Sequence, residues 1–387
     1  MNRTSLLLGM LLLVAVFSCK NDLPPEDLTL PPPRANYAFY LDDYIDSLTS
    51  AARIPGLSIT VVRDRKIDWN QGFGHANIAE GIDVDKDTRF MLAEAAEPVV
   101  AVAVMQMLAE KGYTLDDDIN TLLPRPLAHA NWPAAVITPR MLLSHTSGLR
   151  DNDILLQALY APGDPGQRLR DFVLDYFYSD GKYYSVGHFS TERPGKTYRY
   201  ARVNLALAGY LVEAATGIDF DLYCKTRLFS QLGYTSVSWF LNDLQAQKVA
   251  VPYLDVNGQY QAVEDYGYPM YPAGQLRITG EYLGRLMIAL LQNGSYGDQR
   301  VASDEAVAAS FRVQYPFIDD AQTLGWRLTD ETGTARYTAS GFDTGVSARL
   351  YIDTASGVAV ILLCNASNKG AALDALAARL FDTAALF

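Results

Sequence analysis

The sequence predicts an α+β protein in which helices flank an antiparallel sheet and a mainly helical lobe is inserted into the chain. Three observations carry this prediction. Strand-like segments rich in β-branched residues lie near both ends of the chain, at 56–72 and 347–365. Helical patterns lie outside these segments, at 37–52 and 371–381. The long stretch between them, about 113–275, mixes short helical patterns with turns and aromatic residues.

The first 36 residues precede this domain and predict export. Residues 1–19 have a short basic start and an apolar run that is too short to span a bilayer. The run ends in Val16-Phe17-Ser18-Cys19, which resembles a lipobox, so Cys19 is the expected site of lipid attachment. A plain secretory signal, cut nearby, is the alternative. Residues 20–36 are rich in proline and predict an extended tether. We therefore expect an exported protein with one domain at 37–387, lipid-anchored to a bacterial membrane and either periplasmic or surface-exposed.

Composition narrows the range of functions. The chain has 387 residues and a net charge of -12, which argues against a nucleic-acid partner because such affinity comes mainly from Lys and Arg. Its four histidines are scattered, and we find no phosphate-binding glycine loop, so neither a metal nor a cofactor is expected. Cys224 and Cys364 lie among apolar or aromatic neighbours, as core cysteines do, and the sequence leaves open whether they pair.

The N-terminal part of the domain predicts a helix followed by a hairpin. Residues 37–52 place apolar side chains at helical spacing, which indicates an amphipathic helix. The β-branched segment 56–63, the tight connection Asp64-Arg65 and the alternating segment 66–72 predict the first two strands of the sheet.

A buried central helix is predicted from Ala95 to Lys111, because this stretch is apolar on nearly all sides. Pro98 then falls in its first turn and Gly112 ends it. The helical lobe follows at about 113–275. The last predicted elements are two strands and a closing helix, at 347–352, 357–365 and 371–381.

Several segments together resemble the serine beta-lactamase and penicillin-binding protein family, which includes class C beta-lactamases, D-Ala-D-Ala carboxypeptidases and related esterases. The most specific segment is Ile137 to Leu149 (ITPRMLLSHTSGL). The others occur in the family's order, at Ile54-Pro55-Gly56, Gly72-Phe73-Gly74, Asp87 to Phe90, Leu115 to Asp117, Leu122 to Pro124, Pro194-Gly195, Tyr198 to Tyr200, Pro272 to Gly274 and Leu324 to Trp326. The resemblance implies a beta-lactamase/transpeptidase-like fold from about residue 40 to the C-terminus.

The family's catalytic motifs are altered in this chain. Members use a serine and a lysine in S-x-x-K, a Y-x-N tyrosine, and K-T-G or H-x-G on a strand edge. The first motif falls on Glu94-Ala95-Ala96-Glu97, so both the nucleophile and the lysine are glutamates. The second keeps Tyr200 but has Arg202 in place of asparagine. The third falls on Ala339-Ser340-Gly341 and keeps only its glycine. Serine acylation is therefore not expected here.

The sequence thus predicts a homologue of the serine hydrolases that is inactive by the serine route. Its degenerate cleft is expected to bind a cell-envelope peptide, a small ligand or a protein partner. The alternative is an active hydrolase that uses Glu94 and Glu97 as an acid and base pair, or another nucleophile. We also hypothesise that Arg202 pairs with Glu97, Glu94 or both. Otherwise the two glutamates would be solvated side chains at a favourable helix N-terminus.

Overall fold

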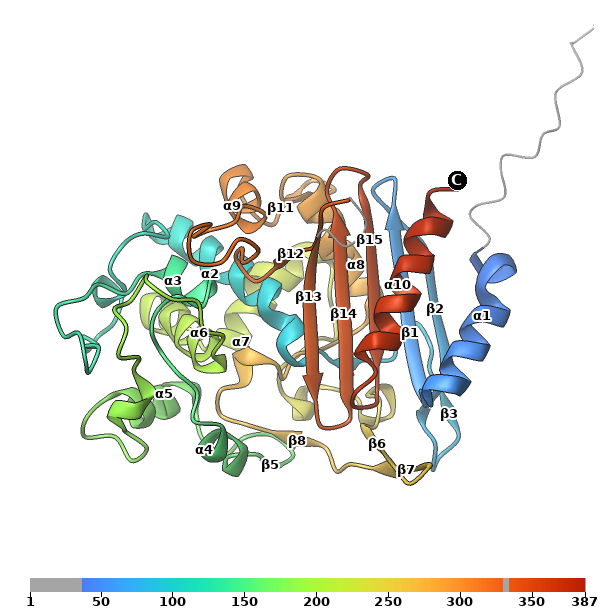
Figure 1. The fold of residues 1–387 in the computed structure, drawn as a ribbon, viewed down its shortest axis with the longest axis horizontal. Helices are drawn as coiled ribbons and strands as arrows, with labels where there is room; N and C mark the ends of the chain where they lie inside the picture. The colour runs from blue at the N-terminus through green and yellow to red at the C-terminus, as the bar shows by residue number, and fades with distance from the viewer. Residues whose placement is uncertain (1–36, 330–333, 387) are drawn as a thin grey trace, which may run out of the picture. The chain divides into compact units, whose positions relative to one another are not determined.

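The framework of the domain is a seven-stranded antiparallel sheet built from both ends of the chain (Figure 1). The computed structural model describes residues 37–329 and 334–386. The two ends of the chain meet where β1 pairs with β15, with Leu57 opposite Cys364 and Val62 opposite Ala359. The sheet order is β12 (Arg327–Thr329), β13 (Arg336–Asp343), β14 (Val346–Asp353), β15 (Val358–Cys364), β1 (Gly56–Arg63), β2 (Lys66–Asn77) and β3 (Ile82–Asp83). The predicted α+β class with its antiparallel sheet is confirmed.

Helices cover both faces of this sheet. On one face lie α1 (Tyr37–Ala52) and α10 (Gly370–Ala384), which pack against alternate residues of β1 and β15 (Figure 1). On the opposite face α8 (Gly280–Leu291) packs against β1, β2 and β15. Because both faces are covered, every residue of β15 is buried, which accounts for its unbroken apolar sequence.

The central helix α2 (Glu97–Lys111) is the main element of the larger core. Pro98 lies in its first turn, and Gly112 ends it with φ 74°, a left-handed conformation that glycine adopts without strain. A short 3-10 turn, η1 (Ala93–Ala96), leads into the helix. The predicted helix is thus present, but its first two predicted residues belong to this tighter turn.

The segment predicted as a helical lobe has more helix than strand, but most of its residues lie in turns and irregular stretches. It lies beside the β12–β13 edge of the sheet in Figure 1. Its helices are α3 (Pro139–Leu143), α4 (Asp153–Ala158), α5 (Leu169–Phe177), α6 (Arg202–Thr216) and α7 (Phe220–Tyr223). Beyond short 3-10 and π-helical turns, the other elements are α9 (Asp304–Ser310) and four strand pairs: β4 (Phe90–Met91) with β9 (Arg277–Ile278), β5 (Ala161–Pro162) with β8 (Tyr266–Gly267), β6 (Tyr253–Val256) with β7 (Gln259–Ala262), and β10 (Ser295–Tyr296) with β11 (Gln299–Arg300).

The sequence also raised the pairing of two cysteines, the role of the N-terminal segment and the presence of membrane-spanning helices. Cys224 and Cys364 are both buried and both free, so they form no disulfide. Residues 1–36, with the predicted signal peptide, Cys19 and the tether, lie outside the described residues. Across 37–329 and 334–386, no helix is both long and apolar enough to cross a membrane.

Candidate active-site cleft

The structure brings the predicted site residues together where η1, the start of α6 and β13 meet. Glu94, Glu97, Tyr200, Ala339 and Ser340 line one cavity of about 230 Å³. We call this cavity the aromatic slot, because three of its remaining lining residues, Tyr198, Trp326 and Phe342, add aromatic rings to that of Tyr200. Its full lining is Glu94, Glu97, Tyr198, Tyr200, Gln322, Gly325, Trp326, Arg327, Thr338, Ala339, Ser340 and Phe342.

A second cavity of about 560 Å³, the charged pocket, adjoins the aromatic slot. Arg202 lines it together with Asp151, Asp153 and Asp343. Glu94, Tyr200 and Phe342 line both cavities and therefore stand between them. The cleft is thus open on both sides of Glu94, which the sequence analysis placed at the nucleophile position of the family motif.

A close backbone packing fixes the position of Glu94. Ala93, just before it, has φ 47° and turns the chain sharply from β4 into η1. The backbone of β13 passes directly over this turn, since a Cβ on Gly341 would lie 1.9 Å from the Leu92 carbonyl oxygen and 2.8 Å from the Ala95 nitrogen. Gly341 is therefore required by packing, which accounts for its presence although the rest of its motif is altered.

The Glu94 carboxyl group accepts hydrogen bonds from two backbone N–H groups. The Phe342 N–H donates to Glu94 Oε2 at 3.0 Å, and the N–H of Glu94 itself also donates. Burial raises the pKa of Glu94 to about 7, and the charge of Asp343 adds to this rise, whereas the two N–H groups and Arg202 oppose it. Paired backbone N–H groups of this kind stabilise the oxyanion in acyl transfer. Here the side chain of Glu94 itself occupies them.

Glu97 is held by neutral donors. It is only 8% exposed, and its Oε2 lies 3.3 Å from His145 Nε2. The backbone N–H of Ala201 donates to His145 Nδ1 at 3.3 Å, so Nδ1 carries no proton and Nε2–H donates to Glu97. The Tyr200 hydroxyl also hydrogen-bonds to Glu97, and burial together with the charges of Glu97 and Glu94 raises its pKa well above the usual value.

The sequence analysis gave His145 no role at the site and missed this contact. His145 has φ 54°, and its ring centroid lies 4.4 Å from that of Tyr200. Its position inside the most specific family segment was a signal, but only the tertiary contact shows that it reaches Glu97. The hypothesis that the two glutamates are solvated is wrong for Glu97, which is buried.

The predicted pairing of Arg202 with Glu97 or Glu94 is also wrong. Arg202 Nε lies 3.1 Å from Asp151 Oδ2, and its Nη2 lies 2.9 Å from Asp153 Oδ1. Asp151 also accepts the backbone N–H groups of Arg202 and Val203, so it caps the start of α6 and is already in place for the guanidinium. Arg202 influences Glu94 only as a nearby charge.

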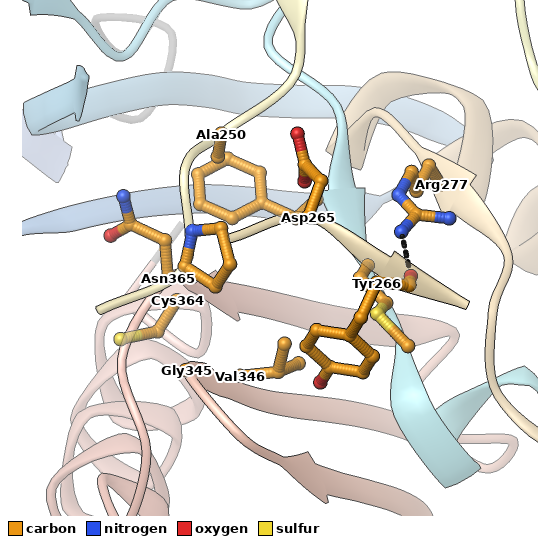
Figure 2. A pocket seen from close by; sticks show the side chains of 11 residues that line it. Ala250, Asp265, Tyr266, Arg277, Gly345, Val346, Cys364 and Asn365 are labelled. Carbon is orange, nitrogen blue, oxygen red and sulfur yellow. Dashed lines mark hydrogen bonds between the residues drawn. The ribbon is translucent and has the colours of Figure 1, made fainter. Parts of the chain in front are cut away.

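The cavity in Figure 2 shares no lining residue with the aromatic slot or the charged pocket. It measures about 10 Å³, which is space for about one water molecule. Arg277 lies beside it, 2% exposed, and donates to the Tyr266 carbonyl oxygen at 2.9 Å. Burial lowers the pKa of Arg277, and the nearby Asp265 opposes this change. Buried carbonyl oxygens thus hold this arginine in the core.

Within residues 37–329 and 334–386, no group of three or more His, Cys, Asp or Glu side chains could hold a metal ion.

Comparison with known proteins assigns the family. A family model described as "Beta-lactamase" matches residues 41–385, and this protein therefore belongs to the beta-lactamase family. Penicillin-binding protein 4 of Amycolatopsis lactamdurans is 24% identical over 344 residues, which cover 83% of each chain. The protein flp of Staphylococcus aureus (strain MRSA252) is 23% identical over 213 residues. That match covers 55% of this chain and 40% of flp, so this chain spans about two-fifths of that relative's length.

The fold is shared with solved penicillin-binding proteins. The crystal structure of a penicillin-binding protein from Bacillus halodurans matches with a TM-score of 0.70 and 23% sequence identity. The match covers 89% of this chain and 99% of that one. At this identity the likeness concerns the fold, so the function has to be argued from the cleft.

Proposed function

We propose that this protein is a non-acylating member of the beta-lactamase family that uses its cleft to bind a ligand. One observation carries the proposal: the carboxyl group of Glu94 takes up the two backbone N–H groups that an attacked carbonyl oxygen would need. The same residue replaces the serine hydroxyl, and Glu97 replaces the activating lysine. The geometry therefore supports neither attack nor oxyanion stabilisation by the serine route.

The open cleft supports a binding role. The aromatic slot offers Tyr198, Tyr200, Trp326 and Phe342 beside the strand edge at Ser340. Phe342 is 67% exposed, although it is a large apolar side chain. Aromatic side chains in a concave site contribute much of the binding energy for apolar groups.

The expected setting of this binding is the cell envelope. With lipid attachment at Cys19 and a tether at 20–36, the cleft would be displayed beside a bacterial membrane. A cell-envelope peptide or a small envelope molecule is the ligand that this setting favours. Mass spectrometry of the protein expressed with its own N-terminus in a bacterial host tests the anchor, since Cys19→Ser should abolish the lipid mass.

Covalent labelling tests the absence of acylation. Intact mass is measured after incubation with a penicillin and with a fluorophosphonate, for the natural protein and for a variant that carries Glu94→Ser with Glu97→Lys. A matched control carries Glu94→Ala with Glu97→Lys. We expect no adduct on the natural protein or the control, and an adduct on the serine variant. A stoichiometric adduct on the natural protein would overturn the proposal.

A hydrolase that uses Glu94 as a general acid is the second candidate. It rests on the pKa of about 7, which would keep a large fraction of Glu94 protonated at neutral pH. Glu97, however, is already engaged by His145 and Tyr200. Turnover of penicillin, peptide and ester substrates by the natural protein, lost in Glu94→Gln, would establish this route.

A further inference from the structure

The hydrogen-bond partners of the Glu97 carboxylate are neutral groups. Its carboxylate is buried in the wall of the aromatic slot, and its partners are the neutral imidazole of His145 and the hydroxyl of Tyr200. Among residues 37–329 and 334–386, no Lys or Arg lies within ion-pair distance of Glu97. Buried carboxylates in proteins are usually paired with a cation, so this arrangement is uncommon.

The arginine side chains near the slot already pair with other carboxylates. Arg202 is held by Asp151 and Asp153 on the far side of Glu94. Arg327 is the one basic residue in the lining of the slot. Its guanidinium pairs with Asp319, with Nη1 3.4 Å from Asp319 Oδ2. Apart from Arg327, which is paired with Asp319, the lining of the slot therefore contains two acidic groups, Glu94 and Glu97, and no basic group.

The walls of the slot suit a cation as well. Tyr198, Tyr200, Trp326 and Phe342 supply aromatic rings, whose faces attract positive charge. Arg327 already shows this interaction, because its guanidinium carbon lies 5.2 Å from the centroid of the Tyr198 ring. The volume of about 230 Å³ suits a head group better than a folded or extended segment of protein.

We propose that the aromatic slot binds an organic cation: a primary or quaternary ammonium group attached to a small apolar group. The ammonium would lie toward Glu97 and Glu94, and the apolar part between the aromatic rings. The inference rests on the proposed ligand-binding role and assigns the chemical class of the ligand. It follows from the reversed charge of the site, since a lysine position has become a buried glutamate.

Titration calorimetry with probes of matched shape and different charge tests this assignment. The probes are benzyltrimethylammonium, phenethylamine, the neutral 2-phenylethanol and the anionic 3-phenylpropanoate, at pH 8 and low salt. We expect both cations to bind at least about tenfold more tightly than the alcohol, since a charge-assisted contact is stronger than a neutral one. The anion should bind more weakly than the alcohol.

Matched variants distinguish the effect of the Glu97 charge on binding from any effect of the substitution on folding. Glu97→Gln keeps an acceptor for His145 and should weaken binding of the cations roughly tenfold while leaving the alcohol unchanged. Glu110→Gln removes the same charge from the exposed end of the same helix and should change nothing. Phe342→Ala, at an exposed position, should weaken binding of all the probes that carry a phenyl ring.

Three results would overturn the assignment. The first is binding of 3-phenylpropanoate that equals or exceeds that of the cations, which would mean that the cleft binds ligands but prefers anions. The second is a cation affinity that Glu97→Gln leaves unchanged. The third is no binding of any cation. Failure of the proposed non-acylating function would appear separately, as a covalent adduct on the natural protein.

Discussion

Replacing Glu94 by glutamine should stabilise the protein at alkaline pH. Burial raises the pKa of Glu94 from 4.5 to about 7, so the folded state binds this proton more tightly than the unfolded chain. At about 1.4 kcal/mol per pKa unit, the difference corresponds to a free energy on the order of 3 kcal/mol. Glutamine carries no charge to desolvate, and its carbonyl oxygen can still accept the Phe342 N–H.

The pH window follows from the direction of the shift. Because the folded-state pKa is raised, the contribution of the protonated group is fully present below about pH 4.5 and is lost as pH rises through about 7. The natural protein and Glu94→Gln should therefore have similar unfolding free energies at pH 5. At pH 8.5 the variant should be more stable by on the order of 2 to 3 kcal/mol.

Urea unfolding at pH 5 and pH 8.5, followed by tryptophan fluorescence, measures this difference. The charged and titratable groups that face Glu94 are the same in both proteins, so their effects cancel in the comparison: Glu97, Tyr160, Tyr200, Arg202, Tyr268 and Asp343. An unfolding difference that does not change between the two pH values would refute the reasoning. It would mean that the Glu94 carboxyl group is hydrated as well in the folded protein as in the unfolded chain.

Three more predictions concern other parts of the structure. Glu213→Gln should give a similar alkaline stabilisation in urea unfolding without changing cation binding, because burial raises the pKa of Glu213 to about 7 far from the aromatic slot. A double-mutant cycle should couple Arg202 to Asp151 by about 1 kcal/mol or more and to Glu97 by close to zero, and strong coupling to Glu97 would contradict the observed ion pairs. Gly341→Ala should cost about 2 to 3 kcal/mol in the same unfolding assay, because its Cβ would overlap the Leu92 carbonyl oxygen; an unchanged stability would refute that packing.

Much of the fold could be predicted because its signals are local in the sequence. The period of apolar residues gives α1 at the predicted residues, Tyr37–Ala52, and β1 at Gly56–Arg63. Gly112 and Pro98 mark the end and the first turn of α2 in the way that their backbone preferences require. The start of β2 at Lys66 was predicted, but its C-terminal end was not, since the strand continues to Asn77 through glycines and loses the alternation on which the prediction relied.

For the site, the sequence predicted the types of residue present, and the structure showed which residues they contact. From the sequence and its family resemblance we predicted which residue types stand at the catalytic motif positions, with Glu94 and Glu97 in place of a serine and a lysine. Only the tertiary structure decided the partners of those residues. Arg202 meets Asp151 because that carboxylate is already held at the start of α6, and Glu97 meets His145 from a distant turn. Which charges pair depends on distances between segments far apart in the chain, and spacing along the sequence does not contain them.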